Sequence, residues 1–150
     1  MITYLVGDAT YPQGLGLKII AHVCNNKGGW GKGFVLAISK RWKEPEQYYR
    51  EFHDIYKLGM TQFVSVGYNL FVANMIAQDG YSTKNKQALS HDALEKCLMI
   101  VNTTAKNYNA SIHMPRIGIG LGGGNWETIE QIINSCCNVP VFVYDLPKKE

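Results

Sequence analysis

Apolar residues occur in short runs typical of strands and in longer segments with helical spacing. The short runs predict strands at residues 2–6, 18–24, 62–67, 70–78, 111–117 and 139–146. Apolar positions three or four residues apart predict helices at residues 33–42, 44–56, 90–107 and 126–137. The two residues 68–69 separate two of the predicted strands, which indicates a β-hairpin.

The order of these elements predicts the fold class. The run KIIAHVC at residues 18–24 is continuously apolar and rich in β-branched residues, which favours a strand buried on both faces of a parallel or mixed sheet. Strands alternate with helices through most of the chain, so we expect an α/β fold. The specific prediction is a three-layer α/β/α sandwich with about six strands in a mixed central sheet and four helices. Residues 1–150 fit a single domain.

Composition and charge exclude several classes of protein. Hydrophobic residues make up 46% of the chain and charged residues 18%, so a charge-rich disordered chain is excluded. The net charge of +3 suits an anionic ligand but is too small and scattered for a nucleic-acid platform. No stretch approaches the roughly 18 apolar residues that span a membrane. We therefore expect a cytoplasmic monomer without a membrane partner.

The cysteines and histidines favour neither a metal site nor a disulfide framework. The four cysteines lack C-x-x-C spacing, and we expect reduced thiols. The histidines outside residue 22 share no metal-ligand spacing, so no metal and no cofactor are predicted.

Glycines gather in two loops, residues 28–33 and 118–124. Each loop follows a predicted strand and precedes a predicted helix. Ligands of open α/β sheets bind beyond the carboxyl ends of strands, and a helix N-terminus favours phosphate. The two loops therefore predict a cradle for a pyrophosphate, although tight turns alone are the alternative explanation. Neither loop has the complete spacing of a P-loop or of a dinucleotide fingerprint.

Four segments together resemble the macrodomain family, whose members bind ADP-ribose. They are GDA at 7–9, HVCN at 22–25, GGWGKG at 28–33 and MPRIGIGLGGGNW at 114–126. The resemblance covers nearly the whole chain and implies a mixed α/β/α sandwich. The second and third segments look closest to yeast-type ADP-ribose 1″-phosphate phosphatases, and MPRIG-x-GL also resembles the terminal ADP-ribose protein glutamate hydrolases.

The resemblance implies a role for each matching segment. Asp8 would accept a hydrogen bond from the adenine amino group, and Ala9 would offer its backbone N–H. Asn25 would contact the distal ribose, residues 29–31 and 33 would lie against that ribose and its phosphate, and residues 118–122 would cradle the pyrophosphate. The implied ligand-binding residues are Gly7, Asp8, Ala9, His22, Asn25, Gly29, Trp30, Gly31, Lys32, Gly33, Pro115, Arg116, Ile117, Gly118, Ile119, Gly120, Leu121 and Gly122.

Three residues are candidates for catalysis: His22, Asn25 and Asp79. In the phosphatase-like members the histidine that matches His22 is implicated in catalysis, as nucleophile, general base or orienting group. A structural histidine in a buried strand is the alternative. The glutamate hydrolases use a lysine and an aspartate where this chain has Gln78 and Gly122, which weighs against a lysine-dependent hydrolase.

Several alternatives remain open at this point. Cys24 is a possible nucleophile, although a cysteine at a strand end more often packs as a small apolar residue. Trp30 and Trp126 flank the predicted ligand site, where an exposed tryptophan would cover a ribose or base, and core packing is the alternative for Trp126.

Three functions compete. The first is a phosphatase acting on ADP-ribose 1″-phosphate. The second removes ADP-ribose from protein or nucleic acid, with Asp79, His22 or a water held by Asn25 as the acid or base. The third is a non-catalytic binder of ADP-ribose or a related NAD-derived metabolite. The expected partners are ADP-ribose or a derivative and, for the second function, ADP-ribosylated macromolecules.

Overall fold

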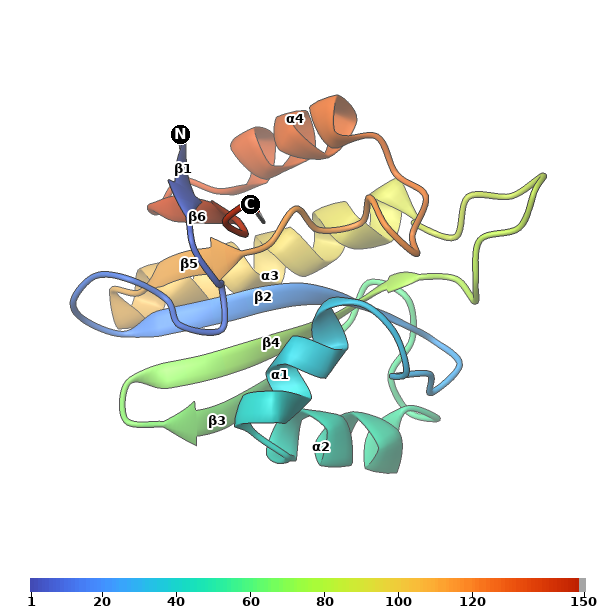
Figure 1. Cartoon of the computed structure of the whole chain (residues 1–150), viewed down its shortest axis with the longest axis horizontal. Coiled ribbons are helices and arrows are strands. Elements are labelled where there is room, and N and C mark those ends of the chain that lie inside the picture. The colour runs from blue at the N-terminus through green and yellow to red at the C-terminus, as the bar shows by residue number, and fades with distance from the viewer. Residues whose placement is uncertain (149–150) are drawn as a thin grey trace.

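The computed structural model describes residues 1–148, which form one six-stranded sheet with helices on both faces (Figure 1). The strands are β1 (Ile2–Val6), β2 (Lys18–Asn25), β3 (Thr61–Gly67), β4 (Leu70–Gln78), β5 (Ser111–Met114) and β6 (Val141–Asp145). The helices are α1 (Phe34–Arg41), α2 (Glu44–Phe52), α3 (His91–Tyr108) and α4 (Trp126–Cys136). The predicted α/β sandwich with a mixed sheet is confirmed. Residues 149 and 150 of the predicted domain lie outside the described residues.

The strands lie in the order β1-β6-β5-β2-β4-β3. Every neighbouring pair is parallel except β3 and β4, which form the predicted antiparallel hairpin. Asn69 makes its turn possible with a left-handed φ of 54°. Because the other five strands run the same way, their carboxyl ends meet at one edge of the sheet. Loops from β2, β4 and β5 leave this edge side by side.

Alternation along β2 divides the core into two clusters. Ile19 and Ala21 pack in the cluster that includes the buried residues of α3 and α4. Ile20 and Cys24 pack in the other cluster, with buried residues of α1 and α2. Successive side chains of a strand point to opposite faces, so His22 lies on the α1 and α2 side.

Some predicted ends were wrong. α2 ends at Phe52 because the chain turns there, with Ile55 N–H donating to Phe52 O at 2.9 Å. β5 ends at Met114 rather than at residue 117, and the proline that follows has no N–H to continue a strand ladder. α3 begins after Ser90, whose side chain accepts from Ala93 N–H. No helix within residues 1–148 is long and apolar enough to cross a membrane.

Candidate functional site

A cavity of about 720 Å³ lies at the carboxyl edge of the sheet, around the end of β2. Both glycine loops contribute to its wall, as the sequence predicted. The predicted residues in the wall are His22, Asn25, Gly29, Trp30, Gly31, Lys32, Gly33, Pro115, Arg116, Ile117, Gly118, Ile119, Gly120, Leu121 and Gly122. Beyond these and Cys24, five wall residues were not predicted as site residues: Val23, Phe34, Val35, Gln78 and Tyr81.

The N-terminus of α1 borders this cavity without a side-chain cap. Gly33 is its N-cap residue, with φ 84°, and no side chain accepts a hydrogen bond there. The backbone N–H groups of Phe34 and Val35 donate to no other residue within 1–148. Ser90 and Asn125, in contrast, cap α3 and α4 with their own side chains. The first turn of α1 therefore keeps free donors and the positive end of its dipole at the cavity.

The second glycine loop folds back on itself. Gly118 O accepts from Gly124 N–H at 2.8 Å. Gly118 has a φ of 78°, and a Cβ there would lie 2.8 Å from Leu89 Cδ2, so a side chain is excluded on both counts. Gly120 differs, because a Cβ would meet nothing within 4 Å. The N–H groups of residues 119–121 have no hydrogen-bond acceptor in the described part of the chain.

Cations, but no carboxylates of residues 1–148, contribute to the cavity wall. Lys32 and Arg116 are the basic residues there. Arg116 Nε and Nη2 donate to Asp145 Oδ1 at 2.7 Å and Oδ2 at 2.9 Å, and these bonds raise the pKa of Arg116. Leu121 Cδ1 lies 3.7 Å from the Cβ position of Gly33, so the two loops meet. A wall with two basic residues, of which Arg116 is held in place, and with free N–H groups suits an anionic ligand.

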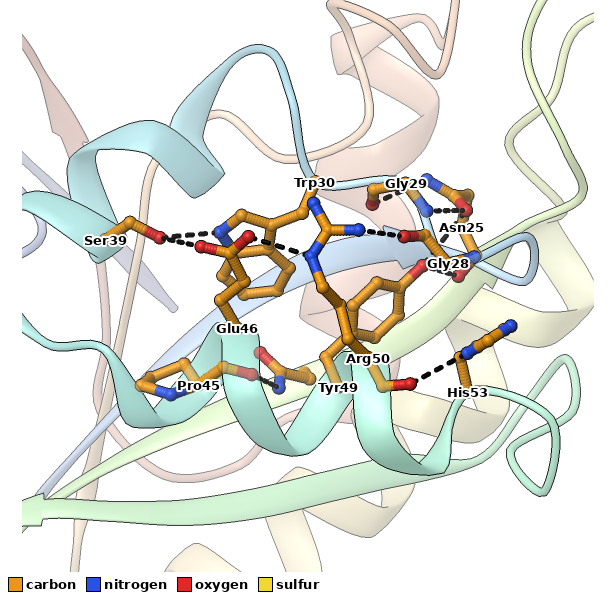
Figure 2. Close-up of polar contacts among 11 residues, drawn as sticks. Asn25, Gly28, Gly29, Trp30, Ser39, Pro45, Glu46, Tyr49, Arg50 and His53 are labelled. Atoms are coloured by element: carbon orange, nitrogen blue, oxygen red, sulfur yellow. Dashed lines mark hydrogen bonds and ion pairs between the residues drawn. The ribbon is translucent and has the colours of Figure 1, made fainter.

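Asn25 organises the start of the first glycine loop (Figure 2). Its Oδ1 accepts from Lys27 N–H at 2.8 Å and Gly29 N–H at 3.2 Å, and its Nδ2 donates to Gly29 O at 3.1 Å. The Tyr49 hydroxyl donates to Asn25 O at 2.6 Å and accepts from Gly28 N–H at 3.1 Å. One of the two Nδ2 hydrogens of Asn25 is used within the loop, so the other remains for the predicted contact with a ribose.

A chain of side chains braces this loop from behind (Figure 2). Trp30 Nε1 donates to Ser39 Oγ at 2.7 Å, and Ser39 Oγ donates to Glu46 Oε1 at 3.1 Å. Arg50 joins Glu46 Oε2 at 2.8 Å to Gly28 O at 2.9 Å. Trp30 is only 3% exposed, so the expectation of an exposed indole covering the ligand was wrong. The acceptor on Ser39 satisfies the indole N–H and lets the ring be buried.

His22 is buried, at 1% exposure, and its Nε2 lies 2.5 Å from Asn74 Oδ1. Asn74 Nδ2 donates to Pro45 O at 3.2 Å and Gln62 Oε1 at 3.0 Å, so the amide oxygen faces His22 and the proton is on Nε2. Burial lowers the pKa of His22 to about 4, and the imidazole is neutral at pH 7. Within residues 1–148, His22 Nδ1 has no hydrogen-bond partner.

Comparison with known proteins decides the family, because the Macro domain profile matches residues 21–133. The chain belongs to the Macro domain family. A solved structure from Bacteroides thetaiotaomicron, of unknown function, is 49% identical with a TM-score of 0.94, covering 97% of this chain and 98% of that one. A macrodomain protein from Streptomyces coelicolor is 44% identical with a TM-score of 0.86, covering 97% of this chain and 99% of that one.

Curated relatives of this macrodomain are less similar. The chromodomain-helicase-DNA-binding protein 1-like of Mus musculus is 29% identical over 99% of this chain, and the chain spans only 18% of that protein's length. The ADP-ribose 1″-phosphate phosphatase of Candida albicans is 28% identical over 96% of this chain and 99% of that protein.

Residues 7–9 of the macrodomain lie outside the cavity wall but at the same sheet edge. Gly7 N–H donates to Asp145 O at 2.8 Å, and the Asp145 carboxylate holds Arg116 in the wall. Asp8 Oδ1 accepts from Thr10 N–H at 2.8 Å. The predicted adenine contacts at residues 7–9 therefore remain a prediction for a ligand that extends beyond the cavity.

Asp79 is not in the wall, so the predicted catalytic residues come together only in part. Its carboxylate accepts from Asn26 Nδ2 at 3.0 Å and pairs with Lys86 Nζ at 3.4 Å. The chain turns at Gly80, with φ 64°, and Gln78 before the turn and Tyr81 after it both line the wall. Trp126 is also outside the wall, and its Nε1 donates to the Tyr4 hydroxyl at 3.0 Å.

Cys24 lies in the wall but is poorly suited to act as a nucleophile. It is 3% exposed, and burial raises the pKa of its thiol well above the usual value. A protonated thiol is a weak nucleophile. Among residues 1–148, no three or more His, Cys, Asp or Glu side chains are placed to hold a metal ion.

Proposed function

We propose that this macrodomain binds ADP-ribose, or a derivative of it, in the cavity. One observation carries the proposal: two groups of residues whose N–H groups have no partner within residues 1–148 line the same cavity. Phe34 and Val35 form one group at the uncapped start of α1, and residues 119–121 form the other. A pyrophosphate needs several donors and no neighbouring carboxylate, and this wall meets both requirements.

The order of strands sets the direction of the ligand. From β1 inward, the carboxyl edge presents Asp8, then Arg116 after β5, then Asn25 at the end of β2. The adenine would lie towards Asp8 and the distal ribose at Asn25, with the pyrophosphate between. The ends of the ligand are assigned by the roles that the resemblance implies for Asp8 and Asn25, and the order of strands places Arg116 between them.

Calorimetric titration with ADP-ribose tests the proposal, with two glycine variants as a matched pair. A Cβ at Gly120 or at Gly67 meets no atom of residues 1–148 within 4 Å, and neither residue has a left-handed φ, so both variants should fold. Gly120→Glu brings a carboxylate to the cavity wall, whereas Gly67→Glu adds one at the end of β3. We expect micromolar or tighter binding by the wild type and by Gly67→Glu, and none by Gly120→Glu.

Two results would contradict this binding function. One is the absence of any measurable binding of ADP-ribose to the wild type. The other is equal affinity in Gly120→Glu and the wild type. Thermal unfolding of both variants verifies that a loss of binding is not a loss of folding.

Hydrolysis of ADP-ribose 1″-phosphate is the second candidate function. It is favoured by the similarity to a phosphatase over nearly the full length of both chains and by His22, a wall residue whose buried Nδ1 has no partner within residues 1–148. Water would add to phosphorus, the bond from phosphorus to the ribose oxygen would break, and ADP-ribose and phosphate would leave. The neutral imidazole of His22 would take the proton of the water at Nδ1 and pass it to the ribose oxygen that leaves phosphorus.

Release of inorganic phosphate from ADP-ribose 1″-phosphate tests this reaction. We expect turnover by the wild type and its loss in His22→Ala, with ADP-ribose binding retained. Equal turnover in the variant excludes His22 as the base. Release of ADP-ribose from modified protein and DNA, measured in parallel, tests the alternative that the protein removes ADP-ribose from macromolecules. Binding without turnover of any of these substrates leaves a non-catalytic binder.

A further inference from the structure

The loop after β4 is tied to the first glycine loop. Asn26 N–H donates to Gln78 O at 3.0 Å, and Asn26 Nδ2 donates to Asp79 Oδ1 at 3.0 Å. Gly80 N–H in turn donates to Asn26 Oδ1 at 2.9 Å. These three bonds fix the backbone immediately before Tyr81 against the residue that follows Asn25.

The hydroxyl of Tyr81 lies directly over Gly29. A Cβ added to Gly29 would collide with that oxygen, so the absence of a side chain at Gly29 allows the approach. Tyr81 belongs to the cavity wall and is 56% exposed. Its hydroxyl makes no hydrogen bond with any residue from 1 to 148. The wall therefore has a phenol whose donor and acceptor are both available to a ligand.

We propose that Tyr81 is a specificity-determining residue that hydrogen-bonds the terminal ribose, the part by which ADP-ribose exceeds ADP. This inference rests on the proposed binding function and on the order of strands. β4 follows β2 along the sheet edge, so Tyr81 lies at the end of the site away from Asp8. A ligand with adenine towards Asp8 brings its terminal ribose between Asn25 and Tyr81.

This role is tested by removing the terminal ribose from the ligand and the hydroxyl from Tyr81, separately and together. ADP-ribose and ADP are titrated into the wild type, into Tyr81→Phe and into Tyr68→Phe as the control. Tyr68 is 95% exposed in the hairpin turn, at the opposite end of β4. We expect Tyr81→Phe to weaken ADP-ribose binding about three- to tenfold, the usual value of one hydrogen bond, and to leave ADP binding unchanged. Tyr68→Phe should leave both unchanged.

The outcomes separate this inference from the proposed function. If the wild type binds ADP-ribose and Tyr81→Phe weakens ADP-ribose and ADP equally, Tyr81 does not read the terminal ribose. Unchanged binding of both ligands in Tyr81→Phe overturns the inference as well. If the wild type binds neither ligand, the proposed function is wrong and the role of Tyr81 falls with it.

Discussion

Tyr49→Phe removes the hydroxyl that holds the first glycine loop to α2. The side chain is fully buried, and burial raises the pKa of the phenol, so the hydroxyl is protonated at neutral pH. It donates to Asn25 O at 2.6 Å and accepts from Gly28 N–H at 3.1 Å. The phenylalanine ring keeps the packing against Trp30, whose centroid lies 5.3 Å away. The variant therefore isolates the hydroxyl from the ring.

The expected loss follows from the two groups left behind. A buried backbone group without a partner costs about 1–3 kcal/mol. The N–H of Gly28 is only partly buried, so water offsets its share, and we expect a loss of about 2 kcal/mol. For a domain of this size that loss lowers the melting temperature by roughly 4–8 °C.

The neighbouring Tyr48 supplies the control for this measurement. It lies on the same helix, is 46% exposed, and its hydroxyl makes no hydrogen bond within residues 1–148. Urea and thermal unfolding should show a loss in Tyr49→Phe and almost none in Tyr48→Phe. A loss below about 0.5 kcal/mol in Tyr49→Phe, or equal losses in the two variants, refutes the bracing role.

Three further predictions concern stability. Because burial lowers the pKa of His22 from 6.5 to about 4, the native state binds fewer protons than the unfolded state, and stability is lost as pH falls from 6.5 towards 4. Between pH 7.5 and 5, the free energy of unfolding, measured in urea, should fall by about 2 kcal/mol less in His22→Asn than in the wild type. An equal dependence on pH in the two proteins would contradict this. Asn74→Leu leaves the donor on His22 and the acceptor on Gln62 without partners in the interior. The free energy of unfolding in the same assay should fall by about 3 kcal/mol, and a fall below about 1 kcal/mol would be inconsistent with this. Glu46→Gln weakens an ion pair with Arg50 that is largely in water, so the free energy of unfolding should fall by less than about 1 kcal/mol. A fall of more than about 2 kcal/mol would contradict this.

Local signals predicted most of the fold. The hairpin was readable because two strand-like runs flank a two-residue break, and Asn69 tolerates the left-handed φ that the turn requires. The end of β5 was missed although a local signal exists. β5 stops after Met114, where its pairing with β6 ends, and Pro115 has no N–H to continue the ladder.

The parts of the candidate site that depend on neighbouring residues in the sequence were predictable. Both glycine loops follow parallel strands, and the parallel order alone brings them to one edge. The burial of Trp30 was not predictable, because it depends on an acceptor from Ser39 and on Glu46 behind it. Tyr81 was missed because it lies in a polar loop without periodicity. Its position after a strand that pairs with β2 is the signal that would have found it.

The glycines themselves distinguish a turn from a ligand site. Gly28 and Gly118 have left-handed φ values, and side chains there would press on His53 and Leu89, so the fold alone requires glycine at both. Gly31 and Gly120 have no such reason, since a Cβ at either meets nothing within 4 Å and neither φ is left-handed. Both nevertheless line the cavity, one on each loop. Tight turns explain the first pair only, whereas the second pair is what a close approach of the protein backbone to the proposed ligand would require.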